Sequence, residues 1–205
     1  MPQSESEEEF IMKKLMVILF AGCVVVMSQG FRKVAADQGY TPLEELAGTY
    51  ALTAHGSFFF CFVPTPPFPP ARCGSPGSAG APIGALQVGA ITYDTAGNWC
   101  ATLTETDTVL PVDAFSHSVS VFNVAGKTTN YDPTTGTGED SFTGYSGGQC
   151  HGATLDSASA TVGDTGTEHF AVSNKAKRID YVVTSITNSV GSIGGISFSD
   201  TALRE

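Results

Sequence analysis

The sequence predicts an all-β protein built as a single antiparallel up-and-down β-barrel of about eight strands. Glycine is abundant, at 23 residues, and only 15% of residues are charged, which is typical of short strands joined by tight turns. Runs of alternating apolar and polar residues recur at regular spacing along the chain. A β-sandwich is the alternative, but closure is the simplest way to remove exposed strand edges.

Residues 1–30 have the features of a wrongly assigned start followed by a cleaved secretory signal helix. Met12, Lys13 and Lys14 precede an apolar stretch over residues 15–27, which supplies the positive n-region and apolar core of such a signal. The stretch is shorter than the roughly 20 residues that a spanning helix needs, so export followed by cleavage is predicted. The acidic run before Met12 then comes from an upstream start, and the mature chain is secreted or periplasmic.

The cysteine content agrees with export, with a lipid anchor on Cys23 as the alternative to simple cleavage. If Cys23 leaves with the signal, Cys61, Cys73, Cys100 and Cys150 remain, an even number that is typical of disulfides in an oxidising compartment. These four residues allow three pairings. A Cys61–Cys73 bond would hold a proline-rich segment, and a Cys100–Cys150 bond would tie the central hairpin to a later glycine-rich segment.

A polar linker is predicted over residues 31–45, followed by the barrel domain over residues 46–205. The first strand begins within residues 46–53, where apolar and polar side chains alternate. A continuously apolar run precedes a cluster of prolines, and proline cannot donate to a β-ladder. Residues 64–82 are therefore predicted to form a proline-rich loop or an extended strap that covers one end of the fold.

Residues 86–108 predict the central hairpin of the domain. Two runs rich in β-branched and aromatic residues flank residues 95–98, where Gly97 and Asn98 can take the positive φ that a reversal needs. The second arm alternates as a strand with one wet side should, with threonines on one face and three apolar residues on the other: Trp99, Ala101 and Leu103.

Further strands are expected in the second half of the chain, separated by turn residues. Alternation and β-branched composition place them at residues 116–124, 126–131, 141–145, 169–174, 177–186 and 192–200. The segment between the third and fourth of these, residues 146–168, is rich in glycine, serine and threonine and is predicted to be a long loop, with a weak strand flanked by loops as the alternative.

Several of these segments together resemble a group of uncharacterised secreted bacterial β-barrel proteins, which are calycin-like in outline, as lipocalins and allene oxide cyclases are. The segments are LAGTYALT (46–53), ITYDTAGN (91–98), YDPTTGTG (131–138), the hairpin over residues 170–183 and the closing glycine-containing strand. The shared unit is a strand, an Asp-x-x-Gly-Asn turn and a Thr-rich return strand. The resemblance covers roughly residues 46–200 and implies a fold, because turn chemistry specifies structure more than activity. It implies no catalytic residue.

Composition disfavours several classes of partner and site. The net charge of −10 repels nucleic acids and anionic membranes, and no membrane span is predicted in the mature form. No nucleophile elbow, zinc-binding helix motif or phosphate-binding loop is present in the sequence, and no cofactor or metal is predicted. The four histidines lie far apart in sequence and are predicted to be ordinary surface residues: His55, His117, His151 and His169.

One pair of carboxylates stands out in the central hairpin. Continuing the alternation beyond Leu103 places Glu105 and Asp107 on the interior face. Either the strand leaves the barrel there and both carboxylates are solvated, which the frequent charges of strand ends favour, or both face a cavity at the barrel mouth. In the second case a small hydrophobic or amphipathic ligand would contact a set of inward residues: Tyr50, Tyr93, Trp99, Glu105, Asp107 and Tyr181.

A second acidic cluster comprises Asp132, Glu139 and Asp140, around a glycine-containing turn. Oxygen-rich clusters of this kind can bind calcium, but the spacing matches no calcium-binding loop. A solvated turn is predicted instead.

The predicted function is that of an exported β-barrel protein that binds a small ligand or has a structural or interaction role at the cell envelope. One alternative is an isomerase or cyclase that uses the barrel interior, with a buried Glu105 of raised pKa as the general acid or base. A second alternative is an inhibitor or interaction module that presents the proline-rich segment. No particular protein partner is predicted.

Overall fold

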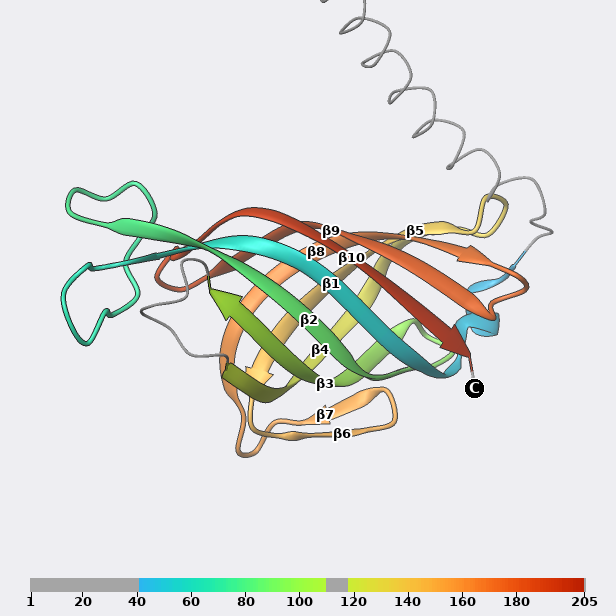
Figure 1. The fold of residues 1–205 in the computed structure, drawn as a ribbon. Helices are drawn as coiled ribbons and strands as arrows, with labels where there is room; N and C mark the ends of the chain where they lie inside the picture. The colour runs from blue at the N-terminus through green and yellow to red at the C-terminus, as the bar shows by residue number, and fades with distance from the viewer. Residues whose placement is uncertain (1–40, 110–117, 205) are drawn as a thin grey trace, which may run out of the picture. The chain divides into compact units, whose positions relative to one another are not determined.

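The computed structural model describes residues 41–109 and 118–204, which form a closed antiparallel barrel in the order β1-β10-β9-β8-β5-β4-β3-β2 (Figure 1). The barrel strands are β1 Gly48–Phe62, β2 Ala79–Tyr93, β3 Asn98–Val109, β4 Ser118–Asp132, β5 Thr137–Ser146, β8 Thr161–Ser173, β9 Arg178–Asn188 and β10 Ile193–Arg204. A separate two-stranded sheet contains β6 Gln149–His151 and β7 Thr154–Asp156. The predicted up-and-down barrel is confirmed, and pairing of β1 with β10 closes it.

The predicted central hairpin is formed by β2 and β3, and Asp94 organises its turn. One Asp94 carboxylate oxygen accepts the backbone N–H groups of Ala96 and Asn98 at 2.8 and 2.9 Å, and the other accepts the Asn98 side-chain amide at 2.8 Å. Gly97 has a φ of 77°, as the turn chemistry predicts. Both strands extend further than the 86–108 range, and β3 pairs with β2 as far as Val109.

Alternation along the strands fills one half of the barrel with a packed core. Tyr50 and Ile179 are fully buried, and the short 3-10 helix Leu43–Leu46 closes this end with Leu46, whose carbonyl oxygen accepts the Tyr50 hydroxyl at 2.8 Å. The remaining buried members of the cluster come from most strands of the barrel: Leu52, Ile91, Tyr93, Trp99, Ala101, Leu103, Phe170, Val172, Ala176, Tyr181 and Ala202.

Glycines in neighbouring strands make room for the large rings inside the barrel. A Cβ on Gly126 would lie 2.4 Å from the Trp99 ring, and one on Gly166 would lie 2.4 Å from the Phe142 ring. Such distances are far below van der Waals contact, so these two positions require glycine. Each of these large rings therefore fits only where the paired residue on the adjacent strand is glycine.

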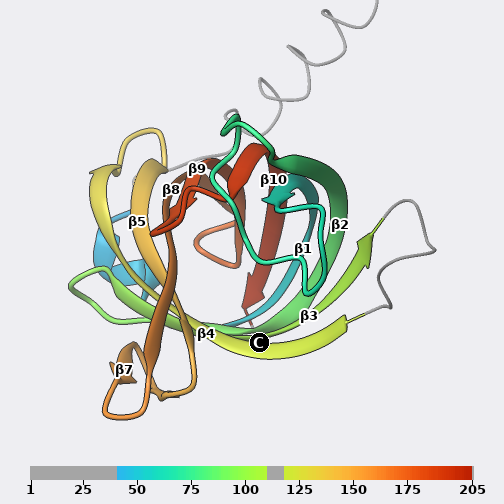
Figure 2. The same ribbon diagram turned by 90° about the vertical axis from the view of Figure 1, so that its left-hand side faces the viewer.

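The proline-rich loop is shorter than predicted, because β2 begins at Ala79 and the loop covers residues 63–78. Pro82 is part of β2, opposite Phe59. It precedes Ile83, the first residue of β2 that pairs with β3, so it occupies a stretch with only one neighbouring strand, where proline is tolerated. The loop projects beyond one end of the barrel and is held by the Cys61–Cys73 disulfide (Figures 1 and 2).

The glycine- and serine-rich segment 146–168, predicted as a loop, contains β6, β7 and the first part of β8 in the structure. The β6–β7 hairpin lies against the outside of the barrel, where Cys150 forms a disulfide with Cys100 of β3. The Asn123 amide of β4 also donates to the carbonyls of Gly147 and Gly148. Residues 161–168 are in a strand because β5 pairs with one edge and, from Asp164 onward, β9 pairs with the other, which local composition does not reveal.

The two disulfides, Cys61–Cys73 and Cys100–Cys150, indicate an oxidising, extracellular environment for this chain. The predicted signal segment, including Cys23, lies outside the described residues, as does His117. Among the residues that the structure describes, no helix has the length and apolar character needed to cross a membrane.

Candidate functional site: the barrel cavity

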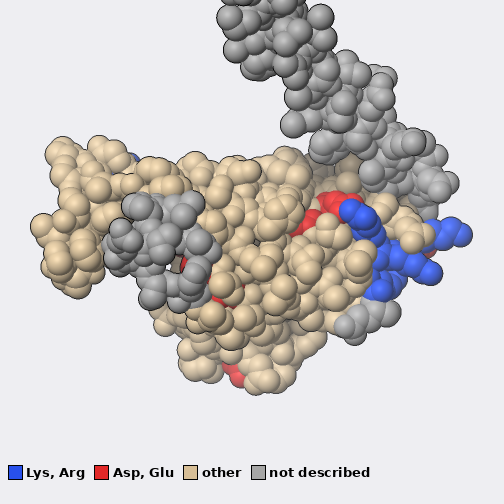
Figure 3. Space-filling model, in the orientation of Figure 1, with Lys and Arg blue, Asp and Glu red and all other residues tan. Residues whose placement is uncertain are grey.

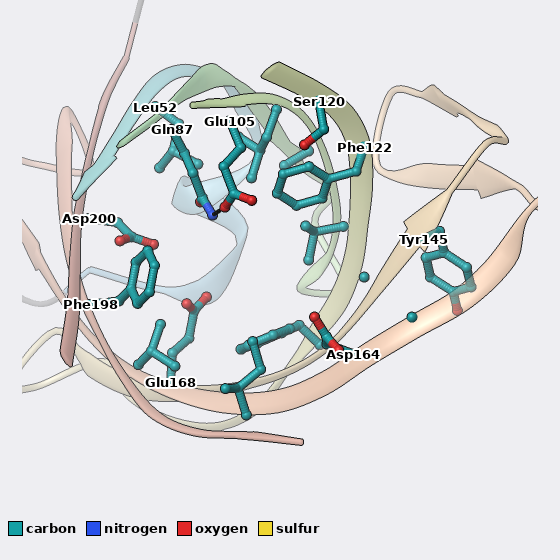
Figure 4. Close-up of a pocket in the computed structure, with 18 of the residues that line it drawn as sticks. Leu52, Gln87, Glu105, Ser120, Phe122, Tyr145, Asp164, Glu168, Phe198 and Asp200 are labelled. Carbon is teal, nitrogen blue, oxygen red and sulfur yellow. Dashed lines mark hydrogen bonds between the residues drawn. The ribbon is translucent and has the colours of Figure 1, made fainter. Parts of the chain in front are cut away.

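The half of the barrel interior that the core leaves unfilled is a cavity of about 370 Å³ (Figure 4). Aromatic and aliphatic side chains make most of its wall. The larger contributors are Leu52, Phe58, Trp99, Leu103, Phe122, Val124, Phe142, Tyr145, Tyr181, Val183, Ile186, Ile193 and Phe198. This volume lies in the range of pockets that hold small organic ligands, and an apolar wall with a few polar groups is their usual composition.

Four carboxyl groups also line the cavity: Glu105 from β3, Asp164 and Glu168 from β8, and Asp200 from β10. In Figure 4 Glu105 approaches from one wall, and Glu168 and Asp200 approach from the facing wall. Of the described lysines, arginines and histidines, none lines this space. The cavity therefore combines apolar walls with acidic groups that the protein does not neutralise.

Glu105 is held by its neighbour on β2, because the Gln87 side-chain amide donates a hydrogen bond to its carboxylate. Burial raises the pKa of Glu105 to about 7; the Gln87 hydrogen bond lowers that pKa, and the negative charges of Asp107 and Asp164 raise it. A carboxyl group with such a pKa changes between its neutral and charged forms near neutral pH. Glu105 can therefore act either as a hydrogen-bonding acid or as a charged acceptor inside the cavity.

Glu168 is the most deeply buried carboxyl group of the cavity wall, at 6% exposure. It makes no hydrogen bond or ion pair with any residue that the structure describes, and it points into the cavity in Figure 4. Burial raises its pKa well above the ordinary value, and the carboxylates of Asp140 and Asp200 raise it further. Burial also raises the pKa of Asp200 to about 7, and one of its oxygens is buried without a described hydrogen-bond partner.

A buried hydroxyl and carboxyl network forms the boundary between cavity and core. The Tyr93 hydroxyl donates to Asp140 at 2.7 Å and lies 3.2 Å from the Tyr181 hydroxyl. Burial raises the pKa of Asp140 to about 6, although the Tyr93 hydrogen bond lowers it. The network links strands β2, β5 and β9, and Tyr181 belongs both to it and to the cavity wall.

The structure brings together part of the set of residues predicted for the ligand site. Trp99, Glu105 and Tyr181 line the cavity. Tyr50 and Tyr93 belong instead to the packed core at the closed end, where Tyr50 is fully buried. Asp107 lies next to Glu105 on the same face of β3 and raises its pKa, but it is outside the cavity wall.

The other carboxyl groups of the interior were not predicted, although alternation carried a signal for them. Glu168 shares its phase with Phe170 and Val172, which are buried, and Asp200 shares its phase with the fully buried Ala202. Asp140 had been assigned to a solvated turn. The structure places it inside the barrel with 0% exposure, whereas Asp132 of the same cluster is exposed and accepts the Thr134 N–H.

No protein-family model matches this sequence, and no curated protein matches it. Among the described residues no three histidine, cysteine, aspartate or glutamate side chains are grouped as a metal ion would need. His55, His151 and His169 stand apart from the cavity wall. The described side chains of the cavity wall therefore offer carboxyl groups, one amide, serine and tyrosine hydroxyls, and aromatic rings.

Proposed function

We propose that this protein is an exported binding protein that holds a small organic molecule inside its barrel. The observation that carries the proposal is the cavity of about 370 Å³, with aromatic walls and inward carboxyl groups on three strands. Export is supported by the two disulfides and by the signal features of residues 1–30. The resemblance to secreted bacterial β-barrel proteins of calycin-like outline supports export and the barrel fold.

The chain contains its own reporter for this test, because Trp99 is the single tryptophan and lies in the cavity wall. A ligand that enters the cavity is expected to change Trp99 fluorescence in a saturable way. A neutral hydrophobic dye such as Nile red serves as the first probe, since it requires no assumption about ligand charge.

Two neighbouring residues of β4 offer a matched pair of variants. Ser120 lines the cavity, whereas Val119 is 68% exposed on the outer face. Ser120→Phe should fill part of the cavity and weaken dye binding about tenfold or more, and Val119→Phe should leave it unchanged. Equal binding by the two variants, or no saturable change in the wild-type protein, would count against the function.

Acid–base catalysis at Glu105 is a second candidate, favoured by the position of this residue in the cavity and by its pKa of about 7. A barrel-type isomerase or cyclase would use such a group to move a proton. Glu105→Gln keeps the shape and the partner Gln87 but cannot exchange a proton. It would abolish turnover of any substrate found, while a binding protein would still bind the neutral dye.

An interaction role for the proline-rich loop stays a prediction, since none of residues 63–78 lines the cavity. Deletion of residues 64–70, with the Cys61–Cys73 disulfide kept, tests it. Loss of binding to a captured partner would support this role, and unchanged binding would exclude it.

A further inference from the structure

We propose that the ligand is a hydrophobic organic cation, whose protonated amine nitrogen is held between Glu168 and Asp200 on one wall and Glu105 on the other. This inference rests on the proposed function and names the chemical class of the ligand. Its geometric basis is the group of carboxyl side chains that point into one shared cavity (Figure 4).

The Glu168 carboxyl group has no hydrogen-bond partner among the described residues. A carboxyl group at 6% exposure without a hydrogen-bond partner among the described residues gains no compensation from them for its burial. Such burial costs several kcal/mol for the charged form. A cation that enters the cavity would supply the missing partner to Glu168 and to the buried Asp200 oxygen at once.

In the part of the chain that the structure describes, no basic side chain lies in the cavity wall to balance these carboxyl groups. Lys175, Lys177 and Arg178 lie in or beside the β8–β9 turn, at the closed end where Arg178 stands opposite Leu203. Arg204 lies over the Tyr50 ring at 5.3 Å at that end, and Lys127 lies opposite Asn98, where β3 begins. Figure 3 shows most of the basic residues on this face gathered at that end of the barrel, whereas Arg72 belongs to the proline-rich loop at the other end.

Once its carboxyl groups ionise, the cavity holds negative charge that no described basic side chain in its wall cancels. A cavity with low-dielectric walls focuses such a field, so cationic ligands are attracted and anionic ligands are repelled. Anions of similar size should therefore bind worst.

The rest of the ligand would lie against aromatic rings. The aromatic rings of Trp99, Phe122 and Phe198 lie in the same wall as the carboxyl groups. Aromatic faces attract an ammonium group by cation–π interaction and also bury an apolar body.

The test uses matched sets of three ligands that share one body and differ in one group: an amine, an alcohol and a carboxylate. Tryptamine, tryptophol and indole-3-acetate form one set, and the corresponding octyl and naphthyl compounds form two more. Isothermal titration calorimetry at pH 8 measures the affinity of each for the full mature chain with both disulfides formed. In at least one set the amine should bind at least about tenfold tighter than the alcohol, and the carboxylate should bind weakest.

Glu168→Gln keeps the volume of the side chain and removes its charge, so it should reduce amine affinity about tenfold while leaving alcohol affinity nearly unchanged. The control is Glu139→Gln, because Glu139 pairs with His169 and Asn130 on the outer face of β5. It should bind as the wild type does. A thermal melt of each variant shows that it is folded.

Three outcomes would overturn the inference. If alcohols bind as tightly as amines, or if carboxylates bind best, the cavity holds a ligand but not a cation, and the proposed function survives. If calcium ions bind the wild-type protein and amines do not, the carboxyl groups serve a metal ion. If Nile red and all three sets fail to bind, the proposed function itself is wrong.

Discussion

The Tyr93 hydroxyl donates a 2.7 Å hydrogen bond to the Asp140 carboxylate across the barrel interior. These residues lie on β2 and β5, which are not neighbours in the sheet, so the bond spans the interior between two separate parts of the wall. The bond stabilises a carboxyl group that is completely buried, and it lies at the boundary between the packed core and the cavity. The first prediction concerns this pair.

Tyr93→Phe should lower the free energy of unfolding by about 1–3 kcal/mol, because it leaves Asp140 buried without this donor. Chemical denaturation measures the change. Tyr145→Phe is the control, since the Tyr145 hydroxyl makes no hydrogen bond with a described residue, and it should change stability by less than about 0.5 kcal/mol. Equal losses in the two variants would show that the Tyr93 bond contributes little.

The ligand-free protein should become less stable as pH rises from about 4 to about 7. Ordinary carboxyl groups titrate near pH 4. Inside the barrel the pKa of Asp140 is about 6, and the pKa values of Glu105 and Asp200 are about 7. The folded state therefore binds protons more tightly than the unfolded state. The stabilisation that this proton binding gives the folded state is complete below pH 4 and is lost as pH rises through these pKa values.

Thermal melts between pH 5 and pH 8 measure this effect, and the melting temperature should fall across that range. Asp200→Asn removes one raised pKa and should flatten the profile, whereas Glu139→Gln should not. A melting temperature that climbs with pH in the wild-type protein would mean that the interior carboxyl groups are not buried as described.

Amine binding should show the opposite dependence on pH, because the protonated carboxyl groups of the ligand-free cavity must release protons to pair with a cation. Titration at pH 7 in two buffers of different ionisation enthalpy should show release of roughly one proton per ligand. Affinity should fall about tenfold or more from pH 8 to pH 5. Buffer-independent enthalpies would argue against carboxyl groups as the amine partners.

The two disulfides should differ in their contribution to stability. Cys100–Cys150 spans 50 residues of sequence and Cys61–Cys73 spans 12. In the chain-entropy model the longer loop gives about 1 kcal/mol more stabilisation, and here it also holds the β6–β7 hairpin on the barrel. Replacement of each pair by serines should therefore lower the denaturation midpoint more for Cys100–Cys150. A larger loss from the Cys61–Cys73 replacement would contradict this order.

Much of the barrel could be predicted from the sequence because the relevant signals are local. The turn residues Asp94 and Gly97 and the alternation from Trp99 to Leu103 determine the central hairpin without reference to any other part of the chain. Extension of the same alternation placed Glu105 in the interior, where the cavity lies.

The remaining parts depend on pairing between distant strands. The side chains of Val183 and Ile186 both line the cavity although simple alternation puts them on opposite faces. The reason is a bulge in β9, where Thr167 pairs with Ser185 but Glu168 pairs with Val183. Likewise, the partner of Asp140 could not be predicted, because Tyr93 is 47 residues away and meets it only after the barrel closes.

A crystal structure of the protein with the tightest-binding amine of the three sets would test the central claim most directly. The account predicts ligand density inside the barrel, with the amine nitrogen within hydrogen-bonding distance of Glu168 or Asp200 and the apolar body against Trp99. Density on the outer face, on the proline-rich loop, or inside the barrel with the nitrogen turned away from every carboxyl group would contradict it.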